Sequence, residues 1–408
     1  MIYVNNPLFI KQISEKLKYL RELSINMQPE EFRGTFGELK EREDKWGKYL
    51  TFLPRVLPPT VTFDPELILA LSKADIKLGK LSGVGFLLPN PNLLILPYLK
   101  KEAIMSSRIE GTRISLSELF LTEAKGNEEN VPDALEVMNY VKAVSYGLER
   151  IEKEPITIEL ITEMHKILMK GVRGEHKLPG EFRKIQNWIG PPNSKPQEAQ
   201  FVPPQPEEVP RLMQELITYL NTDDRLPLLV KCSLMHYQFE TIHPFCDGNG
   251  RIGRSLITLY LCKKKLIIRP LLYLSGYFEA HRREYINLLL STNKEGKFEE
   301  WIRFFLNAVE TQSEDALQRV ARVQKLREEY RQKTQDSFNT TAVTKLIDNL
   351  FMNPFITITK AEEILKVTYP TAKRLVENVV KLGILKSSNE VQRNKIFVAH
   401  EILSILEV

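Results

Sequence analysis

The sequence is poor in cysteine, in long apolar runs and in excess charge of either sign. Its three cysteines, Cys232, Cys246 and Cys262, form no Cys-x-x-Cys pair, so neither a disulfide framework nor a zinc site is indicated. No run approaches the ~18 apolar residues that span a bilayer, and the N-terminus lacks a basic segment followed by an apolar one. A formal charge of +5 over 408 residues names no partner. We expect a cytoplasmic protein that does not enter a membrane.

Helical periodicity dominates most of the chain and predicts a mainly α fold. Apolar residues recur three and four apart from Asp64 to about Arg319, and few stretches alternate. The exception is 180–206, where two short extended pieces joined by a proline-rich loop predict a small β-hairpin inside the helical domain. Residues 1–62 predict a wrapping N-terminal arm with a short amphipathic helix at 8–23.

The C-terminal third predicts a connector followed by a separate module. After a helix around 299–309, the charged segment 311–336 predicts a connecting helix rather than a dimerising coiled coil. Residues 337–408 then read as helix, turn, helix and two-stranded wing, a winged helix-turn-helix domain. Nine Lys and Arg against seven Asp and Glu give this module a charge of only +2, so DNA binding and protein docking both stay open.

The stretch DGNGRIGRS, residues 247–255, matches two nucleotide-binding motifs by its glycine spacing. Gly248, Gly250 and Gly253 have the G-x-G-x-x-G spacing of dinucleotide folds, and the same stretch is one residue away from a P-loop. Both motifs require a buried strand just before the glycines. The preceding segment instead has apolar residues at helical spacing: Leu228, Cys232, Met235, Phe239 and Ile242. Neither motif therefore applies.

What remains is a helix, a loop and a second helix that starts near Asn249. The free N–H groups of a helix start form an anion site, and glycines let a phosphate approach them closely. Arg251 and Arg254, three residues apart, lie on one face and could reach one polyphosphate. Asp247 beside phosphates favours a bridging Mg²⁺. His243, four residues earlier, is placed to act as a base near neutral pH.

This segment, HPFCDGNGRIGR at 243–254, resembles the Fic family signature H-P-F-x-D-G-N-G-R-x-x-R at every specified position. The resemblance covers about residues 65–310 and implies a Fic-type helical bundle over 63–310. It implies a protein adenylyltransferase that moves AMP from ATP to a Ser, Thr or Tyr hydroxyl of a target protein, with Mg²⁺ as the metal.

The resemblance also implies roles for the loop residues. His243 would be the catalytic base and Asp247 the metal ligand. The amides of 248–250 and the Asn249 side chain would bind the α-phosphate, Arg251 the β-phosphate and Arg254 the γ-phosphate. The implied nucleotide-binding set is Gly248, Asn249, Gly250, Arg251, Ile252, Gly253 and Arg254.

Two further groups follow from the resemblance. Trp188, Ile189 and Gly190 resemble the family's flap, whose backbone pairs with the target as an added strand. Tyr285 and Asn293 correspond to nucleoside contacts in relatives, or else are ordinary helix residues.

An upstream motif resembles the family's inhibitory helix, predicted near 93–111. Ser106 and Glu110 are four apart on one helix face, and Gly111 can end the helix. Glu110 could pair with Arg254 and remove the partner of the γ-phosphate. Whether the same glutamate also supports de-AMPylation stays open.

Two alternatives to AMP transfer stay open. One is a phosphotransferase on the same scaffold, against which Gly250 speaks, because the phosphorylating variant of the loop lacks that glycine. The other is a nucleotide-sensing DNA-binding regulator. The expected partners are a target protein, DNA or protein at the winged helix, and a second copy in a homodimer.

Overall fold

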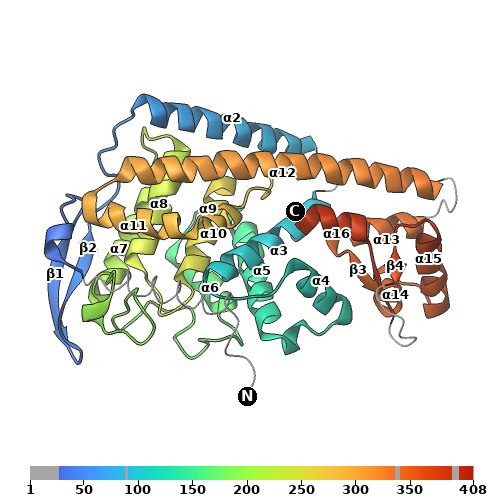
Figure 1. Ribbon diagram of the computed structural model, residues 1–408, viewed down its shortest axis with the longest axis horizontal. Coiled ribbons are helices and arrows are strands. Elements are labelled where there is room, and N and C mark those ends of the chain that lie inside the picture. The colour runs from blue at the N-terminus through green and yellow to red at the C-terminus, as the bar shows by residue number, and fades with distance from the viewer. Residues whose placement is uncertain (1–26, 88–90, 336–340, 388–394, 408) are drawn as a thin grey trace, which may run out of the picture.

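The structure, a computed structural model of the chain, describes residues 27–87, 91–335, 341–387 and 395–407. It is mainly helical, as the sequence predicts (Figure 1). The helix predicted at 8–23 lies outside the described residues. None of the helices in the described ranges combines the length and apolar character that a membrane span needs.

Two consecutive helices form the centre of the larger part of the molecule. They are α8 (Leu228–Ile242) and α9 (Asn249–Lys263), and nearly all of their side chains are buried. A helix that is apolar in every direction must be surrounded by others. The neighbouring helices are α3 (Asn92–Ile109), α5 (Pro132–Ile151), α6 (Ile158–Leu168), α7 (Val209–Asn221), α10 (Ser275–Ala280) and α11 (Arg282–Glu295).

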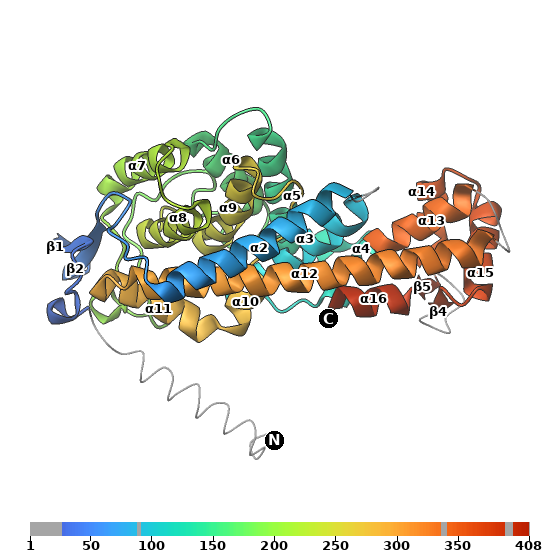
Figure 2. The same ribbon diagram turned by 90° about the horizontal axis from the view of Figure 1, so that it is seen from above.

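One long helix connects this bundle to the C-terminal module. Helix α12 runs unbroken over Phe298–Gln335, roughly 57 Å at 1.5 Å per residue. The separate helix predicted around 299–309 and the connector predicted at 311–336 are therefore one element, because no glycine or proline interrupts the sequence. Helix α2 (Pro65–Leu87) lies along it in both views (Figure 1, Figure 2).

The N-terminal arm contains a β-hairpin that the sequence analysis missed. Strands β1 (Gly37–Asp44) and β2 (Gly47–Pro54) pair antiparallel, and Asp44 opposite Gly47 closes a two-residue turn. Charged residues fill β1, which hid its alternation. The hairpin packs on the 199–202 segment, where the Phe52 N–H donates to the carbonyl oxygen of Val202 at 2.9 Å.

The hairpin predicted at 180–206 is smaller than expected. Its two extended pieces meet in a single antiparallel bridge between Ile189 and Phe201, and no strand forms within these described residues. The prolines of the segment limit the pairing, because proline lacks the N–H that a ladder needs. Short 3₁₀ turns flank it, at Pro196–Glu198 and Pro206–Glu208.

The described part of the C-terminal module runs helix, strand, helix, helix, strand, strand, helix, and the winged helix-turn-helix expected for 337–408 stays a prediction. Its elements are α13 (Thr341–Met352), β3 (Phe355–Thr357), α14 (Ile358–Leu365), α15 (Tyr369–Lys381), β4 (Lys386–Ser387), β5 (Ile396–Val398) and α16 (His400–Glu407). The strands form an antiparallel sheet in the order β3-β5-β4. Helix α13 packs on α3, and α4 (Leu116–Lys125) packs on β3, so the module contacts the bundle beyond the α12 connection.

Helix α4, between α3 and α5, is capped at both of its ends. Helix α4 starts with a capping box, in which the Ser115 side chain and Glu118 each bond the other's backbone N–H, and it ends at Gly126 in the left-handed conformation. The remaining 3₁₀ turns are Pro29–Glu31 and Glu128–Asn130.

Candidate active site

The loop between α8 and α9 is held in shape by its own side chains. Helix α8 ends at His243, whose φ of +50° turns the chain sharply. Asn249 closes the loop, because its Oδ1 accepts from the Phe245 N–H and its Nδ2 donates to the Phe245 carbonyl oxygen, both at 2.8 Å. Both polar atoms of Asn249 are thus engaged, and its predicted contact with the α-phosphate stays a prediction.

A buried histidine that the sequence analysis missed supports the loop from below. His165 stacks on Phe245, with ring centroids 3.8 Å apart. Its Nδ1 accepts from the Gly180 N–H at 2.9 Å, so its Nε2 carries the proton and donates to the Asp247 carbonyl oxygen at 3.0 Å. Burial lowers the pKa of His165 to about 4, which keeps the ring neutral.

The predicted base, His243, is neutral and anchored through its backbone. Its Nδ1 lies 3.3 Å from the carbonyl oxygen of Glu240. Its own carbonyl oxygen accepts from Arg183 Nε at 2.9 Å and Asn187 Nδ2 at 3.3 Å. Burial, and then the positive charge of Arg183, lower the pKa of His243 to about 4. A neutral imidazole can accept a proton, as a general base must.

Arg183 and Asn187 are functional candidates that no sequence pattern revealed. Arg183 is almost fully buried, and it also donates to the carbonyl oxygens of Ile242 at 3.3 Å and Pro204 at 2.5 Å. It therefore ties the returning half of the 180–206 segment to the end of α8.

Asp247 lies at the mouth of the loop among cations. Its carboxylate accepts from Lys177 Nζ at 2.9 Å and from the Gly248 N–H at 2.8 Å, and Arg251 lies 3.5 Å away. Burial alone would raise the pKa of Asp247, but the bond and charge of Lys177 and the charge of Arg251 outweigh it and lower that pKa. The carboxylate is thus ionised and able to hold a cation.

The two arginines of the loop have different partners. The Arg251 guanidinium is buried and paired with Glu136 of α5, a contact the sequence did not indicate. Arg254 is equally buried and turns to α3, where Ser106 Oγ accepts from its Nε at 2.9 Å. The prediction that both bind one polyphosphate stays a prediction.

Glu110 makes the contact with Arg254 that its sequence position predicts. Its Oε1 accepts from Arg254 Nη2 at 2.8 Å, and the Ser106 carbonyl oxygen accepts from the same nitrogen at 2.9 Å. Desolvation would raise the pKa of Glu110, but Arg254 outweighs it and lowers that pKa. Helix α3 ends at Ile109, and Gly111 follows with a φ of +104°, as predicted.

The Glu110 carboxylate also touches the start of α9. A Cβ on Gly250 would collide with Glu110 Oε1 and with the Arg254 guanidinium, so only glycine admits this contact. Gly248 precedes the helix with a φ of +76°, and no side chain caps the helix start. The Glu110 carboxylate therefore lies beside the first turn of α9, the end of a helix that favours an anion.

Four of the predicted nucleotide-binding residues make packing contacts or hydrogen bonds between helices in this structure. The Ile252 side chain lies in the core, and a Cβ on Gly253 would strike Glu240 and Phe239 of α8. Tyr285 is buried with its hydroxyl 2.8 Å from His236 Nε2. Asn293 Oδ1 accepts from Tyr237 at 2.6 Å and Thr241 at 3.1 Å. For Tyr285 and Asn293 the structure favours the alternative of helix residues, and direct nucleotide contact by all four stays a prediction.

The predicted docking flap lies beside the loop. Ile189 uses both backbone groups toward Phe201, with its N–H at 2.8 Å from the Phe201 carbonyl oxygen. Because backbone groups alternate along an extended chain, those of Trp188 and Gly190 point the other way. Trp188 stacks edge-on against Trp46 of the N-terminal hairpin, at 5.5 Å between centroids. The missed β1–β2 hairpin therefore supports the flap.

The comparisons with known proteins agree with this geometry. Residues 155–261 match the Fic/DOC family model, and residues 68–149 match the Fic/DOC family N-terminal model. The chain is therefore similar to the Fic/DOC family over these two segments. A Fic family protein from Desulfovibrio desulfuricans shares the fold over 84% of this chain and 98% of its own, with a TM-score of 0.53 and 20% identity.

Two curated proteins that this chain resembles have names that state an activity. A probable protein adenylyltransferase of Aquifex aeolicus is 32% identical over 179 residues, which are 42% of this chain and 51% of the relative. Protein adenylyltransferase Fic of Drosophila erecta is 28% identical over 224 residues, or 52% of this chain and 41% of the relative. The chain thus spans about half the length of the curated relatives it matches.

Proposed function

We propose that this chain is a protein adenylyltransferase that transfers AMP from ATP to a hydroxyl side chain of a target protein, and that Glu110 restrains it. The contact of Glu110 with Arg254 and Gly250 carries the proposal, because a carboxylate occupies a site built for an anion. The names of the relatives, protein adenylyltransferases, support the reaction type.

In the proposed reaction the side chains mainly position and stabilise charge. His243 accepts the proton of the target hydroxyl through Nε2, since its Nδ1 faces the Glu240 carbonyl oxygen. The hydroxyl oxygen then bonds to the α-phosphorus of ATP as the bond to pyrophosphate breaks. The N–H groups that open α9 stabilise the charge on the α-phosphate. Arg254 binds the γ-phosphate once Glu110 has left it.

Asp247 is the residue that would hold Mg²⁺. The described residues contain no cluster of three or more carboxylate, His or Cys ligands, but Mg²⁺ at phosphates needs only one or two carboxylates. An ionised Asp247 beside the anion site fits that requirement. The ion would offset the charge of the pyrophosphate group.

The test compares self-labelling by isotope-labelled ATP among three forms of the full chain. Glu110→Gly should label strongly, the unaltered chain weakly, and Glu110→Gly with His243→Ala should fall by about 10² or more, the usual effect of a lost general base. Mass spectrometry should find an AMP adduct. A phosphate adduct would point to the phosphotransferase alternative, and equal labelling with or without Glu110 would rule out the brake.

A further inference from the structure

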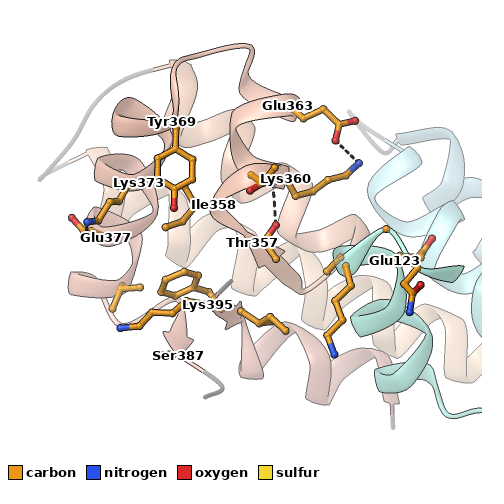
Figure 3. Close-up of a pocket in the computed structure, with 18 of the residues that line it drawn as sticks. Glu123, Thr357, Ile358, Lys360, Glu363, Tyr369, Lys373, Glu377, Ser387 and Lys395 are labelled. Atoms are coloured by element: carbon orange, nitrogen blue, oxygen red, sulfur yellow. Dashed lines mark hydrogen bonds and ion pairs between the residues drawn. The ribbon is translucent and has the colours of Figure 1, made fainter. Parts of the chain in front are cut away.

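A groove far from the His243–Arg254 loop separates the winged helix from the bundle. It has a volume of about 1210 Å³, and none of the loop residues lines it. One wall is the end of α4, around Glu123–Asn127. The others are the start of α14, the outer face of α15, and strands β4 and β5 (Figure 3).

The groove carries positive charge that no carboxylate among the described residues offsets. Its three glutamates are each paired with a lysine: Glu363 with Lys360 at 2.9 Å, Glu377 with Lys373 at 3.9 Å, and Glu123 with Lys100 of α3 at 2.8 Å.

Three other lysines, Lys125, Lys381 and Lys395, have no ion-pair partner among the described residues. They come from α4, the end of α15 and the start of β5. The groove therefore presents three free cations from three sides.

Between these lysines the lining mixes apolar side chains with polar ones such as Thr357. Ile358 and Val380 are partly buried, and Ile396 and Phe397 are buried behind them. A basic rim around a partly apolar floor suits a ligand that offers both carboxylates and apolar side chains.

The geometry disfavours nucleic acid. A recognition helix enters the major groove with a phosphate backbone on each side of it, but α15 faces α4 across this groove. Single strands bind on exposed aromatic rings, and of the lining aromatic residues Tyr369 is exposed whereas Phe397 is 7% exposed. A protein segment fits these walls better than either.

The α4 wall is also connected to the inhibitory helix. Glu123 joins three elements, because its carboxylate bonds Lys100 of α3 and, at 3.4 Å, Asn353 of the winged module. Asn353 also donates to the Phe120 carbonyl oxygen of α4 at 3.0 Å. Lys100 lies on the helix that carries Ser106 and ends before Glu110. Negative charge in the groove would repel Glu123 and loosen its hold on α3.

We propose that the groove binds an extended acidic segment of a partner protein, and that this binding releases Glu110 from Arg254 through α4 and α3. The second half rests on the proposed adenylyltransferase activity. The first half does not, so the two are measured separately.

Binding is measured by fluorescence anisotropy with the full chain. The probe is a labelled peptide of about 10 residues, long enough for an extended chain to span the groove, with alternating aspartate and leucine. Lys125→Gln with Lys381→Gln and Lys395→Gln should weaken binding about tenfold, as expected for three exposed charge pairs. The matched control replaces three exposed lysines elsewhere: Lys73, Lys80 and Lys153.

The control triple should change the affinity less than twofold. Equal loss in both triples, equal binding of a peptide with asparagine for aspartate, or displacement of the peptide by duplex DNA would each overturn the groove as a peptide site.

Release is measured as self-labelling by ATP. The peptide should raise labelling of the unaltered chain several-fold and leave Glu110→Gly unchanged, and Glu123→Gln alone should raise it in the same direction. Labelling by the unaltered chain that does not respond to bound peptide would overturn the release. If Glu110→Gly itself fails to label, the adenylyltransferase proposal fails, and the binding result stands by itself.

Discussion

The loop has two sides, and each side pairs a buried arginine with a glutamate from another helix. On one side Arg251 meets Glu136, whose side chain is 11% exposed and lies in the second turn of α5. On the other side Arg254 meets Glu110, whose side chain is 38% exposed and stands just past the end of α3. The two arginines are three residues apart and buried to nearly the same extent.

The two glutamates differ in how easily each could leave its arginine. The Glu136–Arg251 ion pair is structural, whereas the Glu110–Arg254 ion pair can be released. Glu136 cannot leave without exposing the interior, because residues on both sides of it belong to one continuous helix. Glu110 follows the last helical residue and precedes Gly111, which adopts a positive φ. The chain can therefore move Glu110 away without unfolding α3. We infer that exposure and position in the helix, rather than the presence of an ion pair, mark the brake.

The largest expected effect is the loss of the Glu136 partner. Glu136→Ala should lower the free energy of unfolding by about 3 kcal/mol, because it leaves the buried Arg251 with only the longer, 3.5 Å ion pair to Asp247. Glu110→Ala should lower it by less than about 1 kcal/mol, since Glu110 is more than a third exposed and water can replace it. Urea denaturation followed by circular dichroism measures both.

The same pair of variants should diverge in activity. Glu110→Ala should raise self-labelling, whereas Glu136→Ala should lower it at temperatures where the protein is still folded. If the two variants lose similar stability, or if both raise labelling, then the two sides of the loop do not differ as proposed. Glu129→Ala, in an exposed position just before α5, is the matched control and should change neither quantity.

A smaller effect on self-labelling is expected from loss of the hydrogen bond between Arg254 and the Ser106 hydroxyl. Ser106→Ala removes the hydroxyl that accepts from Arg254 Nε, while the Ser106 carbonyl oxygen and Glu110 still bind the guanidinium. Self-labelling by Ser106→Ala should therefore fall between that of the unaltered chain and that of Glu110→Gly. Labelling equal to the unaltered chain would assign the brake to Glu110 alone.

The sequence was informative where contacts are local and uninformative where they are distant. The 243–254 motif and the Ser106–Glu110 spacing lie within single helices and loops, so their geometry follows from the chain itself. Glu136, Arg183 and His165 reach the loop from other elements, and nothing local marks a residue whose partner is 80 or more positions away, as for His165 and Asp247.

The fold shows the same limit. Helices were predicted because each has its own apolar face, and the long α12 was divided only where its composition changes. The β1–β2 hairpin was missed because β1 is charged throughout, and its burial comes from residues near Phe201. Tyr285 and Asn293 were read from a family correspondence, but their hydrogen bonds point into the bundle.

The smallest effect concerns the charge next to His243 and is a change of pH dependence. With a pKa of about 4, His243 is neutral above about pH 5, so labelling by Glu110→Gly should be flat from there to neutral pH. Arg183→Gln removes a positive charge that disfavours the imidazolium form, so the pKa of His243 should rise toward its ordinary value near 6.5. Because protonated His243 cannot accept a proton, labelling at about pH 6 should fall up to about fourfold relative to about pH 8.

Lysine at position 183 separates the effect of the positive charge from the effect of the hydrogen bonds that Arg183 makes. Arg183→Lys keeps the positive charge, so the pH dependence of labelling below neutral pH should stay near that of Glu110→Gly. Its single nitrogen cannot take the places of both Nε and Nη2, which together bond three carbonyl oxygens, so labelling should be lower at every pH. Lys184 is an exposed neighbour that pairs with Glu181. Lys184→Gln should change neither the pH dependence of labelling nor its level. If labelling by Arg183→Gln and by Arg183→Lys fell equally toward acid pH, burial alone would set the protonation of His243. Arg183 would then act only through its hydrogen bonds to the end of α8.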